Sequence, residues 1–224
     1  MLGPSLYQEL IKPNKRIDIR DLQKILRDLL ICLKFLKDIG IIHCDIKPEN
    51  ILFRQNDFRS VKVIDFGSAI FANDTGYDYI QTRPYRAPEI ILGCHFDFAV
   101  DMWSVGCVLY EIITFKVLFN YKTVQENLAK AMSISDFLGL DLFASTSTKP
   151  KKPFVIGNLL RVGDSGDFNI VVSKGEYKIE NDLRECDCDE ALIDFIKRCL
   201  VFDPAGRLKV EDALNHEFLK KTFV

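Results

Sequence analysis

The stretch 43-HCDIKPEN-50, followed by 65-DFG-67, decides the fold of this chain. Short apolar pieces surround it, and Pro, Asn and Asp separate them: IIHCDI at 41–46, NILF at 50–53 and VKVIDF at 61–66. Such pieces are typical of short strands that end in polar loops. We therefore expect a small β patch where several polar side chains meet, and loops of this kind commonly carry the chemistry of a protein.

These loops hold the groups that phosphoryl transfer to a hydroxyl requires. A carboxylate must orient the attacking hydroxyl and accept its proton, and a cation must neutralise charge on the transferred phosphoryl. Asp45 and Lys47 fit these catalytic roles. Mg²⁺ prefers hard oxygen ligands, which an Asn carbonyl and an Asp carboxylate supply, so Asn50 and Asp65 are the predicted metal ligands.

Segments on both sides of these loops have apolar residues at helical spacing. The segment 21–39 carries Leu and Ile at helical spacing and stops at Gly40, which predicts a buried helix. The segment 101–114, DMWSVGCVLYEIIT, is apolar on nearly every side and predicts a helix that is buried all round. Amphipathic helices are expected at 190–200 and 210–220. The fold class is therefore α+β, mostly helical, with a small β patch at the loops.

Other segments have weaker signals. Ser5 and Gln8 have the form of a capping box, which predicts a short helix. The residues 77–88 are turn-rich and aromatic without a sustained period, so we expect an ordered loop. A helix is expected near 124–138 and a hairpin around 173–176.

Composition fits one globular unit. The chain has 224 residues, with 48% hydrophobic and 28% charged residues, which makes disorder and a coiled coil improbable. The formal net charge of −2 provides no global positive field, so we expect no direct nucleic-acid partner and no membrane partner. No signal peptide and no apolar run of membrane-spanning length is found.

The seven cysteines form a poor disulfide framework, because their number is odd and they are scattered, and this indicates an intracellular protein. Cys186 and Cys188 could suggest a metal clip. Zinc normally requires four Cys or His ligands, and His43, His95 and His216 lie far apart in the sequence. We therefore expect these thiols to be packed or exposed rather than bound to metal.

HCDIKPEN, DFG and the later Ala87-Pro88-Glu89 resemble, in order and in loop context, the catalytic loop, metal-binding loop and activation-segment end of eukaryotic protein kinases. The resemblance implies ATP and Mg²⁺ as cofactors and transfer of the ATP γ-phosphoryl to protein hydroxyls. It places Asp45 and Lys47 at the catalytic step and Asn50 and Asp65 at the metal. The residues it assigns to the ATP site are Leu2, Glu49, Asn50, Leu52 and Asp65.

Further matches cover nearly the whole chain. His43 resembles a structural residue of the catalytic loop, and Asp101 resembles the buried Asp that hydrogen-bonds the backbone of that loop. Arg207, in DPAGR, resembles the Arg that pairs with the Glu of APE, here Glu89. Removing one partner of such a buried pair would leave the other charge buried without a partner. A plain surface charge is the alternative for Asp101 and Arg207.

Within the kinases the sequence is similar to the CMGC group, where two families compete. The start MLGPSLY, the DFGSA stretch and a degraded ENLAKAM at 126–132 resemble the LAMMER (CDC-like) kinases. HCD and YDYIQTR at 77–83 resemble the tyrosine-regulated DYRK family, in which the second Tyr of a YxY is autophosphorylated. We favour LAMMER and keep DYRK as the alternative.

Cys44 replaces the Arg of the common HRD motif. A thiol cannot form the bidentate pair that an activation-loop phosphate makes with Arg, so docking of a phosphothreonine on residue 44 is not expected. We expect Tyr79 to be the modified residue instead, with Arg83 or Arg86 as its partner. The activation-segment residues singled out by the resemblance are Tyr79, Thr82, Arg83 and Arg86.

A kinase also needs a Gly-rich loop and a strand Lys, and neither precedes the catalytic loop in this sequence. The resemblance places Met1 inside the hinge between two lobes, Leu2 beside adenine and Leu52 under the ring. We therefore interpret residues 1–224 as a truncated kinase domain that consists of the hinge and the C-terminal lobe. Gln8 stands where relatives often have an Asp near the ribose, which puts that contact in doubt. The stretch 162–168 faintly imitates a Gly-rich loop, but its position and spacing favour a hairpin turn.

Two functional classes stay open. The first is a serine/threonine or dual-specificity kinase, and the second is a truncated relic that acts as a non-catalytic binding module. For the kinase, the LAMMER resemblance implies that it acts on Arg/Ser-rich splicing factors in the nucleus, with the cytoplasm as the alternative location, and we expect a monomer. The acidic stretch 180–190 could attract basic substrates, although a solvated charged turn is the simpler interpretation.

Overall fold

Helix α1 (Ile19–Asp38) is the longest element of the structure, a computed structural model. Asp18 caps its start, because its carboxylate accepts the Arg20 N–H at 2.9 Å, and Gly40 follows its end with φ +74°. Its Leu and Ile stripe is buried, as the spacing over 21–39 predicted. The structure describes residues 2–55, 57–74, 80–120, 128, 130–131, 133–134, 155–156, 159–162, 168–171 and 178–223, and of 155–171 only the backbone.

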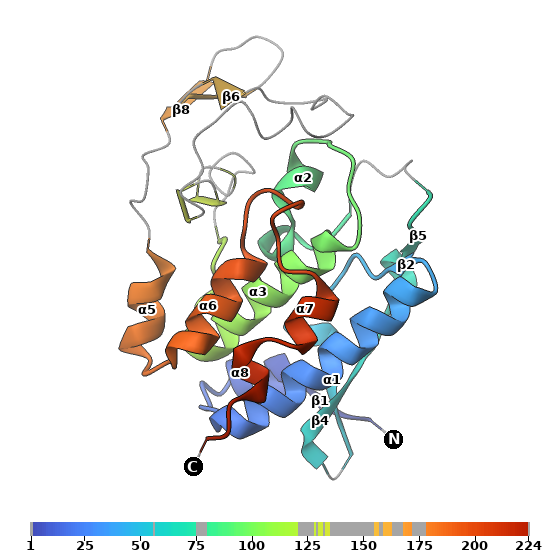
Figure 1. Ribbon diagram of the computed structural model, residues 1–224, viewed down its shortest axis with the longest axis vertical. Helices are drawn as coiled ribbons and strands as arrows, with labels where there is room; N and C mark the ends of the chain where they lie inside the picture. Colours follow the sequence, from blue (N-terminus) through green and yellow to red (C-terminus); the bar gives the residue numbers. More distant parts are fainter. Residues whose placement is uncertain are drawn as a thin grey trace.

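Helix α3 (Ala99–Thr114) forms the centre of the core (Figure 1). All its residues except Ala99 and Ile113 are buried, so the predicted helix is confirmed. It packs against α6 (Glu190–Cys199) at Gly106, where a Cβ atom would lie 2.9 Å from the side chains of Cys199 and Leu200. The absence of a side chain at residue 106 therefore sets the distance between the two helices.

Replacing Gly106 by Ala is expected to destabilise the fold by about 1–3 kcal/mol, because the new methyl group would lie 2.9 Å from the buried side chains of Cys199 and Leu200 and would force them to shift. Urea unfolding of the two proteins measures the change. Gly3→Ala is the control, since a Cβ there would meet its nearest atom at an ordinary 3.5 Å. Equal midpoints for Gly106→Ala and the unsubstituted chain would contradict the proposed close contact.

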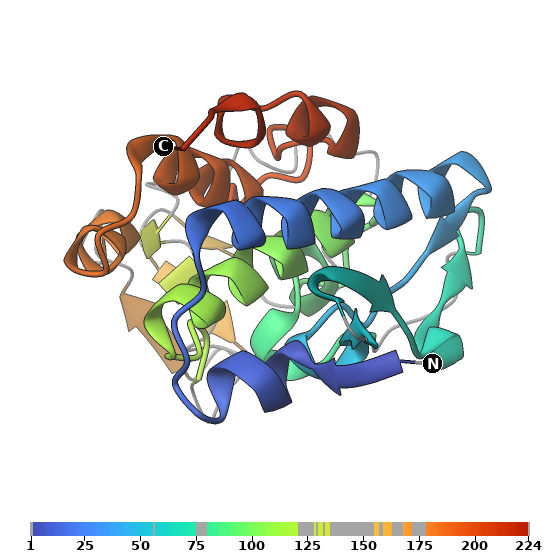
Figure 2. The ribbon, with the colours of Figure 1, turned by 90° about the horizontal axis from the view of Figure 1, so that it is seen from below.

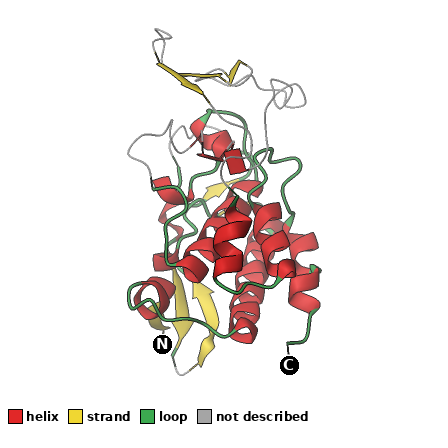
Figure 3. Cartoon of the chain, turned by 90° about the vertical axis from the view of Figure 1, so that its left-hand side faces the viewer, coloured by secondary structure: helices red, strands yellow, loops and turns green. Residues whose placement is uncertain are grey.

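The strands of the N-terminal part lie beside α1 (Figure 2), and Figure 3 shows strands in yellow next to the helices at the end where the N-terminus is marked. The antiparallel strands β1 (Leu2–Ser5), β3 (Ile51–Arg54) and β4 (Asp57–Val63) form one sheet in the order β1-β3-β4. A second pair joins β2 (Ile41–Ile42) to β5 (Ile70–Phe71). The carboxylate of Asp28 on α1 accepts the Ser60 hydroxyl at 2.6 Å and the Val61 N–H at 3.1 Å, which attaches β4 to the helix.

Single helical turns connect these elements. They are the π-helix η1 (Tyr7–Ile11), the 3-10 turns η2 (Pro48–Asn50), η3 (Phe66–Ser68) and η4 (Arg83–Tyr85), and α2 (Pro88–Ile91). The predicted capping box is confirmed: Ser5 N–H donates to Gln8 Oε1 at 3.0 Å and Gln8 N–H donates to Ser5 Oγ at 3.2 Å. The helix that it opens is of π rather than α type.

The C-terminal helices differ from the prediction at two points. The expected single helix at 210–220 was wrong, because the chain forms α7 (Val210–Leu214) and α8 (Glu217–Lys220). His216 causes the break: its Nδ1 accepts the Phe218 N–H at 3.2 Å and so caps a new helix. Helix α5 (Ile179–Glu185) was not predicted, since its charges suggested a solvated turn. The helix α6 confirms the prediction for 190–200.

The segment after α3 is described in part. The described residues between 128 and 134 are helical, in agreement with the helix expected near 124–138, whereas the hairpin expected at 173–176 lies outside the described residues. Strands β6 (Val155–Ile156), β7 (Leu159–Val162) and β8 (Phe168–Val171) form an antiparallel sheet. Val162 pairs with Phe168 across the antiparallel strands β7 and β8, as a hairpin requires, whereas the turn residues 163–167 lie outside the described residues.

The predicted α+β class, mostly helical with a small antiparallel sheet, is confirmed. All seven cysteines are free, and the described residues contain no group of three or more His, Cys, Asp or Glu that could hold a metal. Among the described helices, none has both the length and the apolar character needed to cross a bilayer.

Candidate active site

Asp101 positions the loop that contains Asp45. Its Oδ2 accepts the His43 N–H at 2.8 Å and its Oδ1 accepts the Cys44 N–H at 3.0 Å. Cys44 has φ +62°, a conformation that costs free energy in a residue with a side chain, and the two hydrogen bonds hold it there. Burial raises the pKa of Asp101, whereas these two backbone hydrogen bonds lower it. Asp101 thus contacts the loop from the centre of the core.

Asp45 is surrounded by hydrogen-bond donors. Lys47 Nζ lies 2.7 Å from Asp45 Oδ2, the Thr82 hydroxyl donates to Oδ1 at 2.6 Å, and Asn50 Nδ2 donates to Oδ2 at 3.0 Å. Burial would raise the pKa of Asp45, but these hydrogen bonds together lower it below its ordinary value. The carboxylate is therefore charged at neutral pH and is available to accept a proton.

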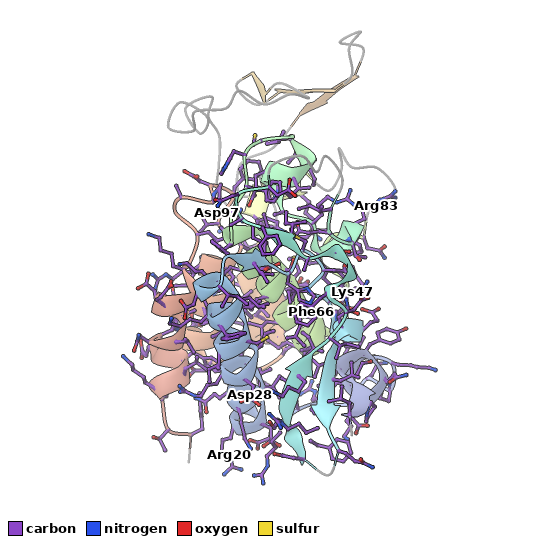
Figure 4. All side chains as sticks on the ribbon, turned by 90° about the vertical axis from the view of Figure 1, so that its right-hand side faces the viewer. Arg20, Asp28, Lys47, Phe66, Arg83 and Asp97 are labelled. Atoms are coloured by element: carbon purple, nitrogen blue, oxygen red, sulfur yellow. The ribbon has the colours of Figure 1, made fainter. Side chains whose placement is uncertain are left out.

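Thr82 lies where a hydroxyl can contact both catalytic groups. Its Oγ1 donates to Asp45 and accepts from Lys47 Nζ at 3.1 Å. Asp45 and Thr82 line a pocket of about 500 Å³ together with Arg83, Arg86 and residues 67–70. Lys47, Phe66 and Arg83 lie on the same side of the molecule (Figure 4).

The DFG loop is joined to the catalytic loop through His43. The imidazole Nδ1 accepts the Asp45 N–H at 3.2 Å, which leaves the proton on Nε2, and Nε2 donates to the Ile64 carbonyl at 3.1 Å. Phe66 meets the same ring edge-on at a centroid distance of 5.0 Å. Asp65 has φ +64° and its Oδ1 accepts the Gly67 N–H at 3.2 Å. His43 thus aligns the two loops that carry Asp45 and Asp65.

Asn50 and Asp65 suit Mg²⁺. The amide nitrogen of Asn50 is used by Asp45, which leaves its carbonyl oxygen available as a ligand. Asp65 is exposed, so its carboxylate is accessible to a cation. Magnesium is commonly bound by one or two protein oxygens, with water and phosphate oxygens as the other ligands. A pair of hard oxygen donors is therefore sufficient for a Mg²⁺ bound together with a nucleotide.

The residues predicted at the adenine end lie on neighbouring strands. β1 carries Leu2, which is 45% exposed, and β3 carries the half-buried Leu52. The side-chain oxygen of Gln8 is used by the capping box at Ser5, so it is engaged by the local backbone. Glu49 is exposed in η2.

Sequence reasoning missed Gln81. It has φ +65°, and its side chain donates to Val100 O and Ser104 Oγ and accepts the Ala87 N–H, at distances of 2.9–3.0 Å. Its carbonyl accepts from Arg86 Nη2 at 2.7 Å. Gln81 thereby attaches the segment beside Asp45 to α3. Its only signal in the sequence was an amide residue within a stretch that is rich in apolar and aromatic residues.

Arg86 was one of two predicted partners for a modified Tyr79. The structure buries its guanidinium, which donates to the carbonyls of Ile80 and Gln81, whereas Arg83 is exposed. This arrangement favours Arg83. Tyr79 lies outside the described residues.

Glu89 and Arg207 form a bidentate ion pair at 2.6 and 2.9 Å, with side chains 2% and 0% exposed. The other N–H groups of the guanidinium donate to the carbonyls of Val201, Ala99 and Phe202, and Trp103 lies under it at 5.1 Å. Every polar group of this pair therefore has a partner, as a buried charge requires.

Sequence reasoning also missed the carboxylate of Glu111. It is 3% exposed on α3, and its Oε2 accepts the Tyr85 hydroxyl at 2.7 Å. Burial raises the pKa of Glu111, and the nearby charge of Glu49 raises it further, although the Tyr85 hydrogen bond lowers it. Its signal in the sequence was a charge, besides Asp101, in an otherwise largely apolar helix.

The acidic stretch 180–190 is largely used within the fold. Glu180 pairs with Lys197, Asp182 with the Tyr110 hydroxyl and Glu190 with Arg184. Asp189 both caps α6 and pairs with Lys221. Most of these carboxylates therefore have partners within the fold.

Comparisons with known proteins agree with this geometry. A family model described as "Protein kinase domain" matches residues 2–219. Similar curated proteins include "Dual specificity tyrosine-phosphorylation-regulated kinase 2" of Drosophila melanogaster (38% identical, covering 98% of this chain and 30% of the relative). "Dual specificity tyrosine-phosphorylation-regulated kinase 4" of Homo sapiens is 38% identical, over 99% of this chain and 42% of the relative.

A third similar protein is "DYRK-family kinase pom1" of Schizosaccharomyces pombe, 38% identical over 98% of this chain and 20% of its own length. The chain therefore spans about a fifth to two fifths of the length of these relatives. Their names support the DYRK alternative, whereas the LAMMER interpretation favoured from the sequence finds no support among them.

Proposed function

Because this chain belongs to the protein kinase family, we propose that it transfers the terminal phosphoryl group of ATP to serine, threonine and tyrosine hydroxyls of proteins. The observation that carries the proposal is the set of contacts around Asp45: a charged carboxylate within 2.7 Å of Lys47 and within 2.6 Å of a hydroxyl. The DYRK-type relatives support the dual specificity.

The residues divide the reaction between them. Asp45 orients the acceptor hydroxyl and takes its proton, and its low pKa keeps it ready for this role. Lys47 neutralises charge that develops beside the acceptor oxygen. Asn50 and Asp65 would hold Mg²⁺, which, when bound, neutralises charge on the nucleotide phosphates. Asp101 and His43 keep the two loops in register.

We also propose that residues 1–224 correspond to the hinge and C-terminal lobe of this kinase. Several large apolar side chains support this, because they are exposed without a covering element in the described part of the chain: Leu2, Ile31, Phe35, Ile39, Phe66 and Phe71. Exposed apolar surface of this kind marks a contact face.

Two proteins test the activity: residues 1–224 alone, and a chimera that places the N-terminal lobe of the human relative in front of residue 1. We expect negligible phosphorylation of a Ser-rich peptide by the first and clear turnover by the second. A well-folded chimera without transfer would overturn the kinase proposal and favour the alternative, a non-catalytic binding module. Turnover by residues 1–224 alone would overturn the assignment of the lobe.

For the substrate class, we propose basic proteins, with Arg/Ser-rich splicing factors as the expected example. Two neighbouring carboxylates support this: Glu111 is buried and Glu49 exposed, and the described residues provide no cation for either. A basic side chain of the substrate would contact the exposed Glu49, where the nearby charge of the buried Glu111 adds to the attraction. A nuclear, monomeric protein is part of the same proposal and rests on the family resemblance alone.

Replacing Glu111 by Gln is expected to weaken selection for basic peptides. In the chimera, the preference in kcat/KM for an Arg-containing peptide over its Ala counterpart should fall by about tenfold, because one nearby negative charge is lost. Glu190→Gln, remote on α6, is the control and should leave the preference unchanged. An unchanged preference in Glu111→Gln would contradict the substrate proposal, while the activity itself would still support the kinase proposal.

A further inference from the structure

We propose that the end of the molecule remote from Asp45 binds an acidic peptide segment of a partner protein. Three parts of the chain form this basic end: the loop 12–18, the first turns of α1, and the hairpin between β3 and β4. Its cations are Lys12, Lys15, Arg16, Arg20, Lys24, Arg54 and Arg59. The proposal is independent of the kinase activity.

This basic end carries more positive than negative charge, unlike the chain as a whole. The carboxylates on the same three parts are Glu9, at the end of the preceding turn η1, and Asp18, Asp21 and Asp57, so cations outnumber them. The whole chain has a net charge of −2, which means that the remainder is more acidic than the average. An anionic partner is therefore attracted to this end rather than to the chain as a whole.

Some of these cations have no internal partner. Lys15 pairs with Glu9, Arg20 with Asp18 and Lys24 with Asp57. Within the described part of the chain, Lys12, Arg16 and Arg54 make no ion pair, and all three are exposed. A folded protein gains little from three unpaired cations on one surface, whereas a carboxylate ligand would neutralise them.

The loop holds its cations in a defined arrangement. Backbone hydrogen bonds join Lys12 N to Tyr7 O at 2.8 Å, Asn14 N to Ile11 O at 3.0 Å and Lys15 N to Leu10 O at 2.8 Å. Asn14 has φ +52°, a turn conformation that asparagine tolerates well. A partner therefore does not have to order this loop when it binds, which lowers the cost of association.

An exposed aromatic ring completes the surface. Phe58, at the β3–β4 hairpin, is 53% exposed, and Lys15 Nζ lies 5.9 Å from its centroid. Lys24 reaches Asp57 at 3.4 Å, and Arg59 lies 3.9 Å from Asp21, so hairpin, loop and helix adjoin. Figure 4 shows Arg20 at this end, far from the labelled Lys47 and Phe66.

A peptide fits this surface better than a lipid membrane. Carboxylates lie among the cations, so the phosphates of a flat anionic bilayer would be repelled by these carboxylates. A peptide can direct its Asp and Glu side chains to Lys12, Arg16 and Arg54 and place one aromatic or leucine side chain on Phe58. Aromatic side chains are frequent energetic centres of such contacts.

Fluorescence anisotropy with residues 1–224 tests the proposal, using a labelled Glu-rich peptide that contains one Phe. The variant Lys12→Glu/Arg16→Glu is expected to bind about tenfold or more weakly at low salt, and Phe58→Ala is expected to weaken binding as well. The matched control Arg198→Glu/Lys209→Glu makes the same change in net charge on exposed residues elsewhere and should leave affinity unchanged.

Three results would overturn the proposal. They are an equal loss in the control variant, equal binding of a peptide with Ser in place of Glu, and tighter binding to phosphatidylserine vesicles than to the peptide. Circular dichroism confirms that each variant is folded, which is expected because the charge variants remove no contact in the described structure. None of these measurements requires ATP, so their outcome is independent of the outcome of the phosphorylation assay.

Discussion

Replacing Glu89 by Ala is expected to cost about 3–5 kcal/mol of folding free energy, because it leaves the Arg207 guanidinium charged and unpaired in the core. The pair is fully buried and joins α2 to the segment before α7. A loss of this size is a large share of the stability of an average domain. Urea unfolding of the chain measures it.

Two further variants decide whether charge is the cause. The exposed pair Arg184–Glu190 is the control, and Glu190→Ala there should cost less than about 1 kcal/mol. Combining Glu89→Leu with Arg207→Met removes both charges and should recover part of the loss, because no buried charge is left unpaired. A double variant as unstable as Glu89→Ala would show that packing, rather than the stranded charge, dominates.

Replacing Asp45 by Asn is expected to lower kcat of the chimera by about 10²- to 10⁴-fold, because the amide cannot accept the proton of the acceptor hydroxyl. The size of the side chain is kept, and its single oxygen can still accept a hydrogen bond from either Lys47 or Thr82, so the fold should be retained. A peptide phosphorylation assay measures the rate. Asp38→Asn, exposed near the end of α1, is the control and should retain full activity.

The pH dependence adds a second measurement of the same residue. Since the pKa of Asp45 is lowered, the rate should not fall with acid until the pH is below the ordinary range of an Asp carboxyl. Lys47→Ala removes a cation that favours the charged form, so it should raise the pKa of Asp45 and move the acidic limb to higher pH. An acidic limb in the same place in both proteins would contradict this electrostatic role.

Much of the site could be predicted because its motifs are local in the sequence. Asp45, Lys47 and Asn50 lie within six residues, and their chemistry follows from residue type and spacing. The helices α1, α3 and α6 were predicted because their apolar patterns reflect burial against the core. The break at His216 was missed, since a side chain that caps a helix leaves a pattern close to that of a continuous one.

What the sequence determined by itself is the set of chemical groups and the elements that carry them: the base, the cation, the metal ligands and the periodic helices. The tertiary structure alone decided which distant groups meet. Gln81 connects to α3, Glu111 lies near Glu49, and four of the acidic residues at 180–190 form ion pairs or hydrogen bonds within the fold. The physical reason is that periodicity and motif spacing depend on neighbours along the chain, whereas hydrogen bonds, ion pairs and pKa values depend on neighbours in space.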